Sequence, residues 1–259
     1  MMIIKSCTHT QLRVIIALIL REIHTLYGHT SLGYLWAVIQ SAFSIGVFWG
    51  VRMFMPTLPP HGMTELSFLV CGFLIWNIFT DTLTRCLNAI DGNRALLTFP
   101  QVFPLDVMLA RSFVVLCTQI VSMSLILGIG MIFGFGVTVS HLGLLLTSLG
   151  LALLFGLGCG TLLATLATYL PALRNIVPMI LRIFFFASGV FFSVSTFSHR
   201  VGEWLLLNPV MQLIEMTRSA MSEGYVSPYF DVEYLLFFNL VVLSTGLLLE
   251  RFIRRRLQA

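Results

Sequence analysis

The sequence has few charged residues. Asp, Glu, Lys and Arg make up only 10% of its 259 residues, while 58% are hydrophobic and the mean hydropathy is +0.95. Soluble domains are typically about 25% charged. A chain of this composition cannot cover a surface that faces water, so we expect its solvent to be lipid. We interpret residues 1–259 as one transmembrane domain, all α-helical.

Several sequence motifs of catalytic, nucleotide-binding and metal-binding sites are absent. Lys5 is the only lysine, so the Gly-Lys-Ser/Thr of a phosphate-binding P-loop does not occur. The sequence also lacks GxSxG, HExxH and CxxC. The five cysteines lie mostly in apolar runs and the six histidines lack the spacing of metal ligands. We therefore expect no catalytic residues, no metal site and no cofactor in this chain, which would not itself be an enzyme.

Six apolar stretches are long enough to cross a bilayer, each of about 20 residues or more. They cover about 32–55, 66–88, 112–133, 143–169, 176–196 and 234–252. If the links alternate between the two sides, 12 of the 15 Lys and Arg residues fall on one side. The positive-inside rule then predicts a multi-pass protein of the inner membrane with both termini in the cytoplasm.

Residues 204–221 resemble a seventh span but contain Asn208, Pro209, Glu215 and Arg218. A central charge costs roughly 2.5–3.5 kcal/mol on the insertion scale, and a seventh span would place the C-terminal arginines outside. We expect short re-entrant or interfacial helices on the outer side, before the last span. Glu215 and Arg218 would share a helix face there.

Residues 9–29 repeat apolar side chains at helical spacing, which predicts an amphipathic helix lying in the inner interface. A signal peptide is the alternative, but Arg21 and Glu22 interrupt its short apolar region and no cleavage site follows.

Asp81 is the main candidate for a proton relay in the membrane, although pairing with Arg85 one turn away is the simpler interpretation.

The link RALLTFPQVFPLDVMLAR at 94–111 is too interrupted to span and too apolar for a free loop. Exposed apolar residues often mark a surface that binds a partner protein. The alternative is that these residues insert into the membrane–water interface. A chain with six spans, no nucleotide site and an apolar cytoplasmic link is typical of the membrane half of an ATP-driven transporter. The predicted ATPase-docking residues are Leu96, Leu97, Phe99, Phe103, Pro104 and Asp106.

Three segments resemble the permeases of type-two ABC exporters, in particular the KpsM-like capsular polysaccharide export permeases. They are LREIHTLYGHTSLGYLWAVIQS at 20–41, VFPLDVMLAR at 102–111 and NPVMQLIEMTRSAMSEGYVS at 208–227. The resemblance implies a homodimer that binds two copies of a cytoplasmic ABC ATPase, where ATP and magnesium would bind. It further implies export of a lipid-linked capsular polysaccharide to periplasmic and outer-membrane capsule export proteins. Nucleic acid is not expected as a partner.

In this family the first and fifth spans line the conduit, and aromatic faces suit sugar rings. The resemblance therefore assigns candidate cargo contacts to Tyr34, Trp36, Phe43, Trp49, Arg182, Phe184 and Phe191. Two alternatives stay open at this point. One is a permease of the same type that exports another lipid-linked glycan, such as O-antigen or teichoic acid, or a drug. The other is a secondary transporter or channel, which would need intramembrane acids or inverted repeats.

Overall fold

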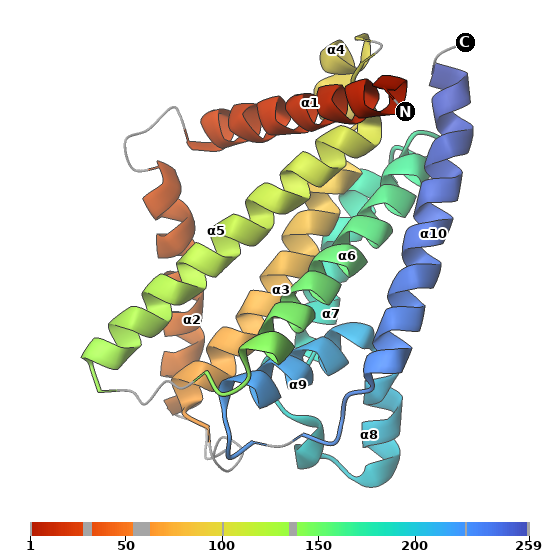
Figure 1. Ribbon diagram of the computed structural model, residues 1–259. Helices are drawn as coiled ribbons and strands as arrows, with labels where there is room; N and C mark the ends of the chain where they lie inside the picture. The colour runs from red at the N-terminus through yellow and green to blue at the C-terminus, as the bar shows by residue number, and fades with distance from the viewer. Residues whose placement is uncertain are drawn as a thin grey trace.

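The structure is a computed structural model that describes residues 2–27, 33–53, 63–99, 101–134, 139–225 and 227–257. At both ends of the first two helices, and at the end of the last, only the backbone is described. Over these residues the chain is helical and contains no β-strand (Figure 1). The helices are α1 (Met2–Tyr27), α2 (Gly33–Met53), α3 (Glu65–Leu87), α4 (Arg94–Leu97), α5 (Pro104–Ile132), α6 (Leu142–Ala167), α7 (Leu173–Ala187), α8 (His199–Leu206), α9 (Pro209–Met221) and α10 (Val232–Leu257).

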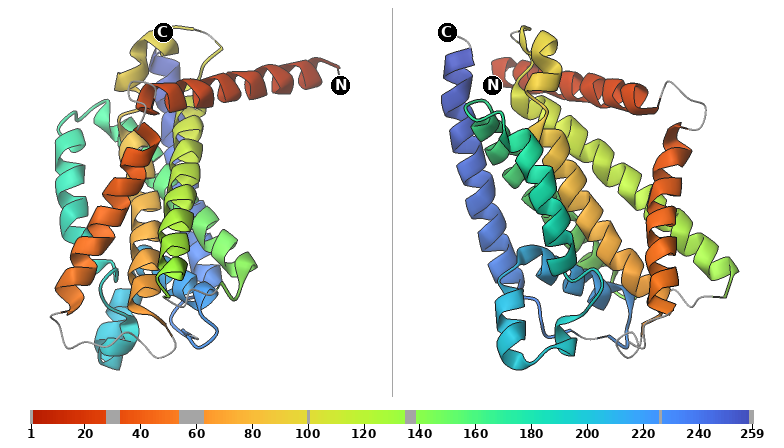
Figure 2. Two further views of the ribbon diagram at one scale, coloured as in Figure 1. Left: turned by 90° about the vertical axis from the view of Figure 1, so that its left-hand side faces the viewer. Right: turned by 180° about the vertical axis from the view of Figure 1, so that it is seen from behind.

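The helix α3 lies at the centre of the bundle, where it packs on α5, α6 and α9. The last helix, α10, packs on α6. The helix α1 lies across one end of the bundle, near both chain ends, while α8 and α9 lie at the opposite end (Figures 1 and 2). We call these the terminus end and the α9 end.

Four of the described helices, α3, α5, α6 and α10, are long and apolar enough to cross a membrane. They overlap the predicted spans 66–88, 112–133, 143–169 and 234–252. The described apolar part of α2, Val38–Gly50, is shorter, and α7 has 15 residues. The first and fifth spans therefore stay predictions.

Three predicted boundaries are wrong. The first helix begins at Met2 and not near residue 9, because no proline or glycine interrupts the residues before it. The helix α5 begins at Pro104 and not near 112, because Pro104 occupies its first turn and the Asp106 carboxylate accepts the backbone N–H of Phe103 at 2.9 Å.

The third error concerns the predicted span 176–196, since α7 ends at Ala187. Gly189 has φ +81°, which a glycine adopts readily and which commonly ends a helix. A Cβ at this position would lie 2.2 Å from the sulfur of Met211, so the Met211 side chain would have to move to accept one. The chain continues as turns to the short 3₁₀ helix Val194–Thr196.

Glycines bring α10 against α6. A Cβ on Gly246 would lie 2.9 Å from the backbone oxygen of Gly158, and a Cβ on Gly158 would lie 3.0 Å from the backbone nitrogen of Leu243. Small residues allow such close backbone approach between membrane helices. The separation of these two helices is therefore set by main-chain contact.

Candidate functional site

Charged side chains from three helices meet at the terminus end. Glu22 of α1 is only 8% exposed and its carboxylate lies 3.2 Å from the Nε of Arg111 on α5. The guanidinium of Arg85 on α3 lies 3.9 Å from the same carboxylate. Arg21 adds a third guanidinium and donates a hydrogen bond to Asn93 in the link. This cluster fixes α1 across the ends of α3 and α5.

The cluster borders a recess of about 760 Å³, which we call the charged recess. Its three arginines face two carboxylates, those of Glu22 and Asp81, so the balance is cationic. Guanidinium groups present several donors in a planar fork that matches carboxylate and phosphate groups. The lining residues are Arg21, Glu22, Thr25, Asp81, Thr84, Arg85, Asn88, Gly92, Asn93, Ala95, Leu96 and Arg111.

The link between α3 and α5 is held from both sides. The Asp91 carboxylate accepts from Arg94 at 3.0 Å and also pairs with Arg174 at the start of α7. Leu96 and Leu97 pack against the small core under α1, whereas the ring of Phe99 is 60% exposed. The link therefore presents an apolar side chain outward while an ion pair connects it to α7.

The other predicted docking residues have internal roles. Pro104 and Asp106 are buried, and Phe103 is partly buried. The Asp106 carboxylate caps α5 and accepts a hydrogen bond of 2.6 Å from Gln11 of α1. These residues shape the link, and of the six predicted residues Phe99 is the most exposed to a partner.

A second recess of about 530 Å³, the aromatic recess, opens between α2, α3 and α7. Phe48, Phe73 and Phe185 form its apolar wall, with ring centroids 5.5–5.9 Å apart. Arg182 lies on its rim, exposed and without a carboxylate partner among the described residues. Its lining consists of Ser44, Phe48, Phe73, Trp76, Asn77, Thr80, Asp81, Thr84, Pro178, Leu181, Arg182, Phe185 and Phe186.

The two recesses share Asp81 and Thr84, so the charged surface continues into the aromatic one. The Asp81 carboxylate accepts a hydrogen bond of 3.0 Å from Gln119 of α5. Arg85 interacts electrostatically with Asp81, as expected, but its closest carboxylate contact among the described residues is Glu22, at 3.9 Å. Asp81 thus stands where α3, α5 and both recesses meet.

The structure separates the predicted cargo residues. Trp36 and Phe43 are exposed on α2, and Trp49 and Phe191 pack partly buried against the core. Phe184 does not face the aromatic recess but a different, apolar groove on the other side of α7. Tyr34 lies in α2, and its side chain is outside the described part.

Sequence reasoning missed most of the aromatic recess. Asn77, Thr80, Asp81 and Thr84 recur at helical spacing in an otherwise apolar span, and this polar stripe is a signal that could have located the recess. The rings of Phe48, Phe185 and Phe186 carried no comparable signal, because aromatic residues are common throughout the chain.

At the α9 end, Glu215 and Arg218 form a fully buried ion pair, with both side chains 0% exposed and 3.2 Å between Oε1 and Nη1. The predicted pairing on one helix face is confirmed, and the burial is complete and not partial. Arg218 also donates to the carbonyls of Gly189 and Val190, at 2.8 and 3.1 Å, and its guanidinium lies 3.5 Å from the ring centre of Phe68. A further donation reaches Phe192 at 3.1 Å.

The second Glu215 oxygen accepts from the hydroxyls of Ser227, at 3.0 Å, and of Tyr225. Burial, followed by the neighbouring Glu215 carboxylate, raises the pKa of the Tyr225 phenol, which keeps it a donor. Asn208 and Pro209 begin α9, because the Asn208 side chain accepts the backbone N–H of Val210 at 3.0 Å. We call Glu215, Arg218, Tyr225 and Ser227 the α9 network. Its hydrogen bonds run to groups within the chain and join α9 to the segments on either side.

Comparison with known proteins adds to this geometry. The profile of a family described as ABC-2 type transporter matches residues 13–222. The polysialic acid transport protein KpsM of Escherichia coli is 27% identical over 235 residues, 91% of each chain. The capsule polysaccharide export inner-membrane protein CtrC of Neisseria meningitidis serogroup B is 27% identical over 92% of this chain and 89% of its own. The O-antigen export system permease protein RfbA of Myxococcus xanthus is 29% identical over 78% of this chain and 77% of its own.

Proposed function

This chain belongs to the ABC-2 type transporter family, and from that membership we propose that it is the transmembrane subunit of an exporter that moves a lipid-linked capsular polysaccharide across the bacterial inner membrane. A homodimer of the chain would bind two copies of a cytoplasmic ABC ATPase, which would hold ATP and magnesium. Periplasmic and outer-membrane capsule export proteins would receive the cargo.

The observation that carries this proposal is the continuity of the two recesses at Asp81 and Thr84. A lipid-linked acidic glycan has anionic groups and sugar rings on one molecule. The guanidinium groups of the charged recess match carboxylate or phosphate, and the rings of the aromatic recess offer flat faces for sugars. Arg182, which has no internal carboxylate partner among the described residues, would contact anionic groups at the rim.

The experiment measures ATP hydrolysis by the chain reconstituted with its ATPase. We expect a lipid-linked acidic polysaccharide to stimulate hydrolysis more than the same lipid without glycan. Arg182→Gln should reduce this stimulation and leave basal hydrolysis unchanged, whereas Arg200→Gln, exposed on α8, should change neither. Equal rates with and without glycan, in a complex that hydrolyses ATP, would contradict the proposal.

A second candidate cargo is an O-antigen or another lipid-linked glycan, which the similarity to the Myxococcus permease supports. The same assay separates the two. Stimulation by a neutral lipid-linked glycan that equals stimulation by an acidic one would favour the second candidate, because the cationic recess would then contribute nothing to recognition.

For the topology we propose six spans, with α2 and α7 completing the four apolar helices, and the terminus end in the cytoplasm. The helix α1 would lie in the inner interface, since it crosses the bundle and exposes Leu12, Ile16 and Leu20. The helices α8 and α9 would form the outer re-entrant segment. A reporter after Ala259 should read cytoplasmic and one at Gly224 periplasmic, and a periplasmic signal after Ala259 would refute this arrangement.

A further inference from the structure

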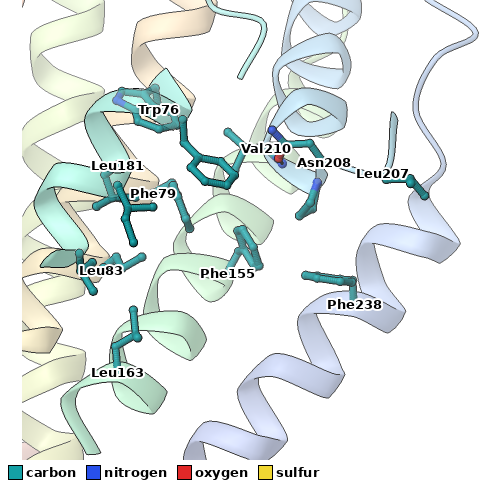
Figure 3. Close-up of a pocket in the computed structure, with 14 residues that line it drawn as sticks. Trp76, Phe79, Leu83, Phe155, Leu163, Leu181, Leu207, Asn208, Val210 and Phe238 are labelled. Carbon is teal, nitrogen blue, oxygen red and sulfur yellow. The ribbon is translucent and has the colours of Figure 1, made fainter. Parts of the chain in front are cut away.

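An apolar groove of about 440 Å³ lies beside α7 and adjoins the aromatic recess at Trp76 and Leu181, which line both. Its walls come from α3, α6, α7 and α10, and the start of α9 closes one end (Figure 3). Three of these helices, α3, α6 and α10, are among those long and apolar enough to cross a membrane. The groove therefore lies at membrane depth and not in a water-facing part of the chain.

The floor of the groove is buried and its rim is open. Phe79, Phe155 and Val210 are buried at the floor, whereas Ile180, Phe184 and Leu207 at the rim are exposed. Phe238 of α10 points across the groove toward Phe155 of α6, with ring centres 5.7 Å apart (Figure 3). The opening between α7 and α10 thus leads sideways, toward the surroundings of the helices.

The chemistry of the lining excludes a polar ligand. Among the described residues that line the groove, only Asn208 has a side chain that is neither aliphatic nor aromatic, and its oxygen already caps α9. An apolar cavity does not hold water, and empty space deprives the lining atoms of packing contacts. A hydrocarbon occupant supplies those contacts without leaving a polar group unpaired.

The shape of the groove indicates which hydrocarbon fits. On α6 the lining runs from Phe155 to Leu163, and on α3 from Trp76 to Leu83. The α6 stretch corresponds to roughly 12 Å along the helix axis at the rise of 1.5 Å per residue. The groove is therefore elongated parallel to the membrane-crossing helices, as an extended chain would be.

We infer that this groove binds one fatty acyl chain of a bilayer phospholipid, which packs behind α7 and supports it against α3, α6 and α10. Such support matters for α7 because Val177 is its only buried residue among the described ones. The inference depends on the position of the chain in the membrane and not on the identity of the exported cargo, so the two can fail separately.

The test uses fluorescence quenching by bromine atoms on acyl chains. Trp76 lines the groove and is 8% exposed, and the other tryptophans, Trp36, Trp49 and Trp204, are replaced by phenylalanine. The full chain is reconstituted in nanodiscs of phosphatidylcholine with or without brominated acyl chains. We expect brominated lipid to quench Trp76 strongly although the protein shields it.

Filling variants locate the quencher, since Trp76 also borders the aromatic recess. Leu163→Phe and Val177→Phe each add volume only in the groove, and each should abolish most of the quenching. The matched control Leu240→Phe, on the exposed face of α10, should leave quenching unchanged. Two filling variants are used so that misfolding of one leaves the other informative.

Three outcomes would overturn the inference. The first is equal Trp76 fluorescence in brominated and plain lipid. The second is quenching that persists in both folded filling variants, which would place the acyl chain in the aromatic recess. The third is quenching that appears only when the lipid anchor of the cargo carries the bromine, which would assign the groove to the cargo instead of the bilayer.

Discussion

Buried charge is handled differently at the two ends of the molecule. In the α9 network, Glu215 and Arg218 are fully buried and their bonds run to each other, to backbone carbonyls and to neighbouring hydroxyls. In the cluster at the terminus end, Glu22 is buried but Arg85 is 32% exposed and lies 3.9 Å away from it. The first set of charges is closed to outside ligands, and the second leaves donors directed into a recess.

This difference separates structural from functional use of charge. Taking an ion pair out of water is costly unless its hydrogen bonds are satisfied, and in the α9 network both terminal nitrogens of Arg218 and both oxygens of Glu215 find partners within the chain. The charged recess keeps the side chains of Arg21 and Arg85 about one-third exposed, which leaves guanidinium groups accessible to an anion that arrives later. Four substitutions follow in decreasing order of expected effect; those at Arg218, Glu22 and Asp91 test this contrast, and the one at Phe99 tests the link beside the charged recess.

Removal of one member of the buried pair should have the largest effect. Arg218→Gln leaves the Glu215 carboxylate buried and uncompensated and frees three backbone carbonyls, and breaking such pairs costs roughly 3–5 kcal/mol. We expect a large fall in the thermal midpoint of the purified chain. The double variant with Glu215→Gln should recover part of the loss, because the unpaired charge is gone.

The exposed pair of His199 and Glu203 provides the control for this experiment, with side chains 90% and 65% exposed. Glu203→Gln should leave the midpoint unchanged, since surface pairs contribute little. A thermal midpoint for Arg218→Gln equal to that of Glu203→Gln would show that the α9 network is not structural.

Phe99→Asp should have the second largest effect, on ATPase binding and not on folding. Burial of one phenylalanine is worth roughly 1.5–3 kcal/mol, so affinity for the ATPase should fall about 10-fold or more. Because the Phe99 ring is already 60% exposed, the thermal midpoint should not change. Pull-down of the ATPase measures the first and differential scanning fluorimetry the second.

Phe197→Asp, exposed and two residues before the start of α8, is the matched control and should bind the ATPase normally. Undiminished pull-down by both Phe99→Asp and the double variant with Phe103→Asp would place the docking surface elsewhere.

Glu22→Gln should destabilise the chain less than Arg218→Gln does. Because the surrounding arginines reach water, the cost should be about 1–2 kcal/mol, between the values for exposed and buried pairs. Exchange of the pair, Glu22→Arg with Arg111→Glu, should restore part of the thermal midpoint. Arg94→Gln, with an 80% exposed side chain, is the control. A loss as large as that of Arg218→Gln would remove the contrast between the two ends.

Asp91→Asn should have the smallest effect on stability, about 0–1 kcal/mol, since both Asp91 and Arg174 are partly exposed. We expect normal basal ATP hydrolysis but weaker stimulation by cargo, because the link would lose its ion pair to α7. Arg94→Gln removes the other partner of Asp91 and should retain stimulation. Equal stimulation in both variants would show that the ion pair does not couple the link to α7.

The sequence predicted the apolar helices well because a run of apolar residues is a local signal. The spans at α3, α5, α6 and α10 overlap their predicted ranges, and the Glu215–Arg218 pair followed from their spacing. The end of α7 was not predicted, because the apolar run continues past Gly189 and because Arg218 of α9 binds the carbonyls of Gly189 and Val190. These residues are far apart in the sequence.

The candidate site was predicted less well for the same reason. Asp106 was expected at a partner surface, but its carboxylate caps α5 and binds Gln11 of α1. Phe184 and Arg182 are two residues apart, so on a helix they face different directions, and they line different cavities. The resemblance named aromatic residues on α2 and α7 but could not indicate the side to which each one points.

The glycine contact between α6 and α10 determines which positions of α10 should tolerate substitution. Because main-chain atoms of Gly158 and Gly246 set the separation of the helices, the exposed side chains of α10 do not determine how closely it packs on α6. Substitution among apolar residues on that face should therefore be tolerated. A Cβ at Gly246 would lie 2.9 Å from the backbone oxygen of Gly158, so substitution there should be tolerated less well than substitution on the exposed face of α10.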